Sequence, residues 1–135
     1  MSTKEKYRQS ETVIVKRSQI NFAPYNPKRH SEEAVKQIRD NIKRVAFLGG
    51  IIWNEVTGNL IDGHKRVMAL DIINKYDGSA ERDYDVKVEK ISLDEKTEKE
   101  QNIFQTKSRT DLDDLLLAEL LKDVDVENTG LTDED

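Results

Sequence analysis

Hydrophobic positions along the chain follow two spacings, one typical of strands and one typical of helices. Short β-branched or alternating stretches predict four strands, at residues 13–15, 51–53, 60–61 and 86–91. Apolar residues three or four positions apart predict four helices, at residues 32–45, 64–73, 93–107 and 110–124. The pattern therefore indicates strands and helices that follow one another within a single folding unit.

Two of the predicted helices have recognisable first turns. Ser31 is an N-cap residue followed by two acids, and Ser92 and Glu95 have the spacing of a capping box. Ile103 and Phe104 are the expected anchors of the helix that follows Ser92. The last helix carries a wide apolar stripe, made of Leu112, Leu115, Leu116, Leu120, Leu121 and Val124.

The chain divides into one domain and three flanking segments. Residues 1–11 are polar without periodicity and are expected to be a disordered arm, and residues 12–107 form the expected domain. Residues 108–127 hold the C-terminal helix, and residues 128–135 are expected to be a disordered acidic tail. With 135 residues, 36% hydrophobic and 36% charged, the chain has room for one small core.

Charge is distributed unevenly along the chain. The net charge is −5, but residues 111–135 contain ten acids and one base, so residues 1–110 carry +4. There is no cysteine, which excludes disulfides, thiolate metal sites and cysteine nucleophiles. No stretch has the apolar length of a signal peptide or a membrane helix, so we expect a cytoplasmic protein with no membrane partner.

The most distinctive feature lies where the third strand runs into the second helix. Asp62 and Gly63 end the strand, and His64, Lys65 and Arg66 open the helix. A glycine allows a sharp turn there, after which the first helical amides point unbonded N–H groups outward, as an anion requires. Arg66 can add bidentate contacts to phosphate oxygens and Lys65 a point charge.

A simple turn followed by a solvated helical turn is the alternative interpretation of this stretch. Cations at a helix N-terminus are disfavoured by about 0.3–1 kcal/mol each, so three potential cations there call for an external reason. The basic helical face formed by Lys36, Arg39, Lys43 and Arg44 has a similar alternative, because such faces are often only solvated.

Residues 20–73 resemble the N-terminal domain of ParB-like proteins, which have the ParB/sulfiredoxin-like fold. The matching pieces are Asn26-Pro27-Lys28-Arg29, Asn41-Ile42-Lys43, Ile51-Ile52-Trp53 and Asn59-Leu60-Ile61-Asp62-Gly63-His64-Lys65-Arg66-Val67-Met68-Ala69. The resemblance is closest to the phage and mobile-element type. It implies an α+β fold, a small mixed sheet flanked by helices, to which this chain adds the C-terminal amphipathic helix.

The resemblance also implies a phosphate or nucleotide site and a setting in DNA handling, such as plasmid, phage or chromosome partition. The implied binding residues are Gly63, His64, Lys65, Arg66, Lys28, Arg29 and Asn102. The ligand would be DNA or a nucleotide, CTP or ATP/ADP, with Mg²⁺. Sulfiredoxin activity is excluded because His64 stands where that family has its cysteine. Partition proteins that hydrolyse CTP generally have arginine at the position of Met68 and glutamate at the position of Gln101. These two differences argue against CTP hydrolysis by this chain.

Two other classes of function remain open. An enzyme on this fold, such as a nuclease, an NTPase or a small phosphotransferase, would use Asp62 or His64 in proton transfer, although no catalytic set can be assigned. An acidic interaction module would keep residues 63–66, the phosphate box, only as a vestige. It would bind a partner protein or a second copy through residues 112–124. The pattern predicts no dedicated metal site and no helix-turn-helix, and it leaves open whether the chain is a fragment of a longer protein.

Overall fold

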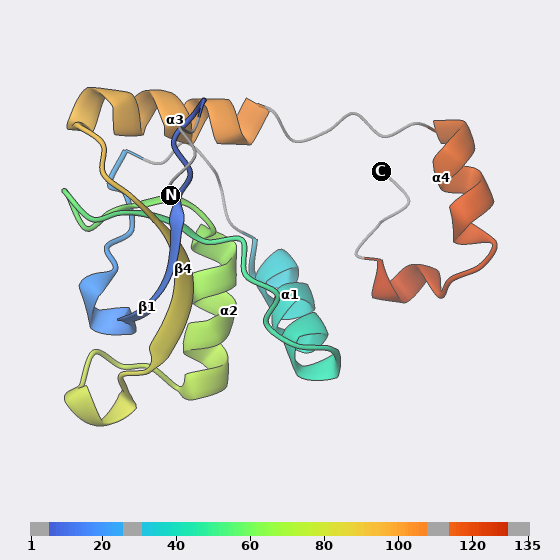
Figure 1. The fold of residues 1–135 in the computed structure, drawn as a ribbon. Coiled ribbons are helices and arrows are strands. Elements are labelled where there is room, and N and C mark those ends of the chain that lie inside the picture. Colours follow the sequence, from blue (N-terminus) through green and yellow to red (C-terminus); the bar gives the residue numbers. More distant parts are fainter. Residues whose placement is uncertain (1–5, 26–30, 108–113, 130–135) are drawn as a thin grey trace, which may run out of the picture.

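The computed structural model describes residues 6–25, 31–107 and 114–129. It is an α+β fold in which four strands form one mixed sheet (Figure 1). The strands are β1 (Glu11–Lys16), β2 (Ile52–Asn54), β3 (Leu60–Asp62) and β4 (Asp85–Ile91). The helices are α1 (Glu32–Arg44), α2 (His64–Asn74), α3 (Glu95–Lys107) and α4 (Asp114–Leu121), with 3-10 turns η1 (Arg17–Gln19), η2 (Ala80–Arg82) and η3 (Val126–Asn128).

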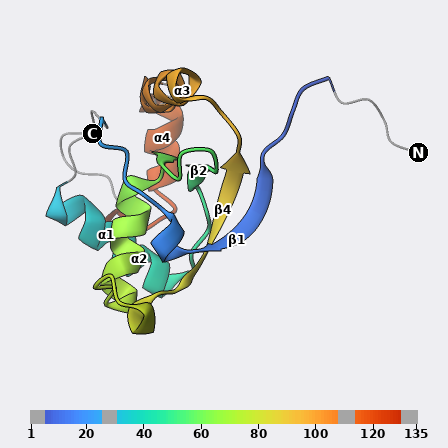
Figure 2. The ribbon, with the colours of Figure 1, turned by 90° about the vertical axis from the view of Figure 1, so that its left-hand side faces the viewer.

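The strand order is β1-β4-β2-β3, so the two long strands lie at one side of the sheet and the two short ones at the other. β1 and β4 are antiparallel with Val13 opposite Val88, β4 and β2 are parallel, and β2 and β3 are antiparallel. The helices α1 and α2 lie on one face of this sheet, and α3 lies across one of its ends (Figures 1 and 2).

The core lies between the sheet and α2. Along β4, buried Val86 and Val88 alternate with exposed Asp85 and Lys87, which confirms the expectation of a strand with one wet face. The buried residues that make up the core cluster are Ile20, Ile51, Trp53, Leu60, Val67, Leu70, Val86 and Val88.

The first turn of α1 confirms the predicted N-cap. The Ser31 hydroxyl accepts a hydrogen bond from the Ala34 amide at 3.1 Å, and the helix begins at the next residue, Glu32. The helix ends at Arg44, one residue before the predicted end, and the chain from 46 to 51 has no regular structure before β2.

The predicted anchors of α3 are wrong. Ile103 and Phe104 are 61% and 60% exposed, whereas Glu98 and Asn102 are fully buried. These two polar residues are four positions apart and so lie on one helical face, which packs against the sheet through hydrogen bonds. The residue that caps the helix is Asp94, whose carboxylate accepts from the Thr97 amide at 2.7 Å, in place of the predicted Ser92.

The C-terminal helix ends three residues before its predicted end at residue 124, since α4 covers Asp114–Leu121 and a separate turn, η3, follows. Its predicted start at residue 110 lies outside the described residues. Its predicted stripe is open to solvent at Leu115, which is 83% exposed, and at Leu120, which is 60% exposed. At the other end, β1 begins at Glu11, the last residue of the expected arm. Residues 1–5, 112 and 130–135 lie outside the described part of the chain. No helix among the described residues has both the length and the apolar character to cross a membrane.

Candidate functional site

The predicted sequence of strand, glycine and helix is present at the start of α2. Gly63 follows β3 directly and is the N-cap residue of α2, with φ 99° and ψ 17°. This left-handed conformation favours glycine. The Gly63 carbonyl accepts the first helical hydrogen bond, from the Val67 amide at 3.0 Å, and the first turn contains no acidic residue.

Gly63 is packed tightly against the segment before β2. A Cβ atom at this position would lie 2.9 Å from the Ile51 Cα and 3.1 Å from the Gly50 carbonyl oxygen. No side chain fits there, which explains the glycine on packing grounds as well as on backbone grounds. Because Gly63 itself is buried, any ligand of this turn must contact the residues that follow it.

The two residues predicted for proton transfer lie inside the protein. His64 is 3% exposed and Asp62 is 9% exposed. The Nε2 atom of His64 accepts a hydrogen bond from the Ala23 amide at 3.4 Å, and the ring packs against Phe22 with 5.7 Å between centroids. Through these contacts His64 joins residues 22 and 23 to α2.

Lys65 and Arg66 are the residues of the box that reach the surface, where both are partly exposed. The Arg66 guanidinium turns back over the loop before β2, and its Nη1 atom lies 3.5 Å from the Gly50 carbonyl oxygen. A Cβ atom on Gly50 would lie 3.0 Å from the Arg66 Cζ atom. Gly50 therefore leaves the space in which the guanidinium lies.

A cleft of about 500 Å³ opens beside Arg66, between α1, the loop 46–50 and the segment around η3. Arg44 and Arg66 are both among its lining residues, so two arginines border one cavity. Asp40 and Glu127 line it as well, so the formal charges of the four ionisable lining residues balance. Arg44 was predicted only as part of a basic helical face, and nothing in the sequence indicated that it would share a cleft with Arg66.

A buried carboxylate, which sequence reasoning missed, holds α3 to the rest of the domain. Glu98 is fully buried and accepts hydrogen bonds from the Asn54 amide group at 2.8 Å, from the Asn59 amide group at 3.2 Å and from the hydroxyls of Thr57 and Tyr25. All four donors are uncharged. The donors come from the β2–β3 turn and from the segment before α1, so one carboxylate joins three parts of the chain.

These hydrogen bonds decide the ionisation of the Glu98 cluster. Burial alone would raise the pKa of Glu98, but the hydrogen bonds from its four donors outweigh burial and hold the pKa below its usual value. Burial and the hydrogen bond to Glu98 both raise the pKa of the Tyr25 phenol. Glu98 is therefore an ionised carboxylate at neutral pH, and Tyr25 remains a protonated donor to it.

Asn102 lies one turn further along α3, against the strand that leads into the box. Its Nδ2 atom donates to the Ile61 carbonyl oxygen at 3.0 Å, two residues before Gly63. The structure thus places this predicted binding residue beside the strand end. The other two, Lys28 and Arg29, lie outside the described residues. Across the part of the chain that is described, no cluster of three or more metal-ligating side chains occurs.

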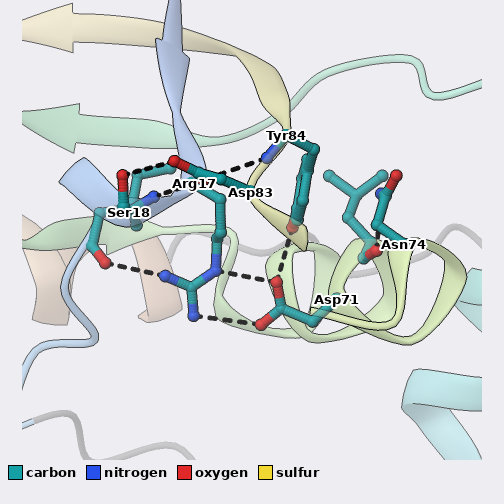
Figure 3. A network of polar contacts seen from close by, with 8 residues as sticks. Arg17, Ser18, Asp71, Asn74, Asp83 and Tyr84 are labelled. Atoms are coloured by element: carbon teal, nitrogen blue, oxygen red, sulfur yellow. Dashed lines mark hydrogen bonds and ion pairs between the residues drawn. The ribbon is translucent and has the colours of Figure 1, made fainter. Parts of the chain in front are cut away.

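A second polar network, shown in Figure 3, fixes the opposite end of α2. Arg17 makes a bidentate ion pair with Asp71, with Nε–Oδ1 at 2.8 Å and Nη2–Oδ2 at 3.1 Å, and its Nη1 donates to the Ile20 carbonyl at 3.0 Å. The Tyr84 hydroxyl also donates to Asp71, at 2.7 Å. Burial lowers the pKa of Arg17, but the hydrogen bond and the charge of Asp71 together outweigh burial and raise the pKa above its usual value. The guanidinium therefore stays charged.

Comparison of the chain with protein-family models found no match, and no curated protein matches it. The resemblance to ParB-like proteins thus depends on the motif residues themselves, above all on the stretch from Asn59 to Ala69.

Proposed function

We propose that this chain is a ParB-like domain that binds the phosphate groups of a nucleotide or a nucleic acid at the start of α2. Lys65 and Arg66 supply the charge, and Arg44 adds a second guanidinium across the adjoining cleft. The setting that the resemblance implies is the handling of plasmid, phage or chromosomal DNA. Binding, without cleavage of a bond, is the activity proposed.

The observation that carries the proposal is the shared cleft of Arg44 and Arg66. Guanidinium groups bind phosphate oxygens in bidentate geometry, and two of them bordering one cavity can hold two oxygens or two adjacent phosphates. The N-terminus of α2 adds its partial positive charge, and its first turn contains no acid that would oppose an anion. The cleft therefore has room for a phosphate group and two arginines that can contact it, while Asp40 and Glu127 balance their charge.

Binding is better supported than catalysis because of where the titratable groups lie. Asp62 and His64, the two residues with which a hydrolytic reaction could move a proton, are both buried. A general base must lie within hydrogen-bond reach of the proton that it removes. Buried as they are, Asp62 and His64 are not placed to reach a ligand that lies at the surface.

A titration tests the proposal directly. CTP, ATP, ADP and a short DNA duplex are each added to the wild type, Lys65→Ala and Arg66→Ala at low and moderate salt, with binding followed by calorimetry. Arg82→Ala is the matched control, since Arg82 is an exposed base on η2, after the C-terminal end of α2. We expect the two box variants to lose about tenfold or more in affinity, and the control to bind like the wild type.

The dependence on salt separates the two kinds of ligand. Affinity for duplex DNA should fall steeply as salt rises, because each neutralised phosphate releases a counterion. Affinity for a single nucleotide should fall less. Equal binding in the wild type and both box variants would contradict the proposal, as would a loss of affinity in the control of the same size.

A further inference from the structure

The sheet has one open edge among the described residues, and it belongs to β1. Figure 2 shows β1 beside β4 with no other element beyond it. The edge at β3 is occupied, because the Asn21 carbonyl accepts from the Leu60 amide at 2.9 Å and the Asn21 amide donates to the Gly58 carbonyl at 2.8 Å. β1 is therefore where backbone groups of the sheet remain available to a further strand.

The register identifies the backbone groups of β1 that point away from β4. The Arg17 amide donates to the Tyr84 carbonyl at 2.8 Å, in the pairing that continues the β1–β4 ladder. Backbone groups in an antiparallel pair alternate in direction, so those of Val13 also point toward β4, and those of Thr12 and Ile14 point outward. The Lys16 amide, which points outward too, is bonded to the Gln19 side chain at 2.9 Å, so the open edge stops before Lys16.

The outer side of β1 lacks the features that normally block an edge strand. Proline, a bulge or a charge in the middle of the strand would prevent another strand from pairing. β1 has none of these between its terminal residues, and its pairing with β4 is continuous from Glu11 to Lys16. Ile14 at its centre is 69% exposed, so an apolar side chain lies beside the outward-pointing amides.

We propose that β1 pairs in antiparallel fashion with β1 of a second copy of this chain, about a two-fold axis at Val13. In this register Thr12 lies opposite Ile14 of the second copy, and each such pair exchanges two backbone hydrogen bonds. An axis at Ile14 would need the amide of Lys16, which Gln19 already occupies. The result is one continuous sheet through both copies.

The charges of the strand favour a second copy of the same chain as the partner. With the axis at Val13, Lys16 lies opposite Ser10 of the second copy, whose hydroxyl donates to Glu89 at 2.8 Å. Lys16 is already paired with Asp85 of its own copy at 2.7 Å, and Glu11 lies opposite the uncharged Val15. The pairing therefore places no like charges face to face, as a stable cross-strand pairing requires.

A pairing of this length buries less surface than a standard interface, so the dimer should be weak, with a dissociation constant on the order of 10–100 µM. Sedimentation equilibrium from 10 µM to 1 mM measures it in the full chain. Ile14→Pro removes an amide that only the dimer uses, and Ile14→Lys places a charge beside the axis. Val56→Lys is the matched control, because Val56 is 63% exposed in the β2–β3 turn and away from the edge.

We expect the wild type and Val56→Lys to associate equally, and both Ile14 variants to associate at least tenfold more weakly. Circular dichroism shows whether Ile14→Pro is folded, and Ile14→Lys decides the question if it is not. Amide exchange gives an independent result: Thr12 and Ile14 should become protected as concentration rises, while Val13 stays protected throughout. A chain that remains monomeric to 1 mM, or a dimer that persists in both Ile14 variants, overturns the proposal.

Discussion

Replacing Glu98 with glutamine is the perturbation whose effect the structure specifies most closely. The substitution keeps the size of the side chain and removes its charge. One carboxylate oxygen of Glu98 accepts from Asn54 and Thr57, and the other accepts from Asn59 and Tyr25. A glutamine can present only one oxygen, so in either orientation its NH₂ group faces two donors.

The size of the effect follows from those contacts. A hydroxyl can rotate to accept a hydrogen bond, so Thr57 or Tyr25 can adapt to the new NH₂ group. The amide nitrogen of Asn54 or Asn59 cannot, and it stays opposed to another donor. Hydrogen bonds to a charged group contribute about 1.5–3 kcal/mol each, so losing one and weakening a second should lower the free energy of unfolding by about 2–4 kcal/mol.

Urea denaturation followed by circular dichroism measures this difference. The matched control is Glu95→Gln, which removes the same charge from the same helix at an exposed ion pair with Lys99, where the cost should be under about 0.5 kcal/mol. If Glu98→Gln and Glu95→Gln unfold at the same urea concentration, the buried carboxylate does not hold α3 to the domain and the reasoning is refuted.

Three further predictions concern pH, the second network and the glycine turn. The pKa of Glu98 in the folded state lies below its usual value of 4.5. The ionised carboxylate therefore stabilises the folded state fully above about pH 4.5, and this stabilisation is lost as pH falls through the folded pKa. The difference in unfolding free energy between wild type and Glu98→Gln should accordingly shrink in acid. Arg17→Met leaves the Asp71 carboxylate partly buried without its ion pair and should cost about 3 kcal/mol in urea unfolding; a loss under about 1 kcal/mol would contradict this. Gly63→Ala should destabilise the domain by at least about 2 kcal/mol more than Gly78→Ala, because both glycines have positive φ but only Gly63 has atoms within 4 Å of the added methyl group; equal thermal midpoints would count against the tight packing.

Local patterns predicted the elements that depend on local physics. The alternation of Val86 and Val88 with polar residues was predicted correctly, and so was the N-cap at Ser31. Each of these features involves only residues that are a few positions apart in sequence. The turn at Gly63 was recognised for the same reason, since a glycine between a strand and a helix is a short-range signal.

The errors arose where distant residues decide the structure. In α3 the apolar residues Ile103 and Phe104 are exposed, because the buried face is polar and is matched by donors more than 35 positions away, such as Asn54 and Thr57. No periodicity in α3 reveals a partner of that kind. The cleft shared by Arg44 and Arg66 likewise depends on how two helices pack. For Glu98 the sequence offered one signal, the donors Asn54, Thr57 and Asn59 close together before Gly63.

Chemical-shift mapping with an isotopically labelled chain tests the proposed phosphate site most directly. CTP, ATP or a short DNA duplex is added stepwise while the backbone amide signals are followed. The proposal predicts saturable shifts at Lys65, Arg66, Arg44 and Gly50 with at least one of these ligands, and their disappearance in Arg66→Ala. Saturable shifts that map elsewhere, or none with any of the ligands at millimolar concentration, would contradict it.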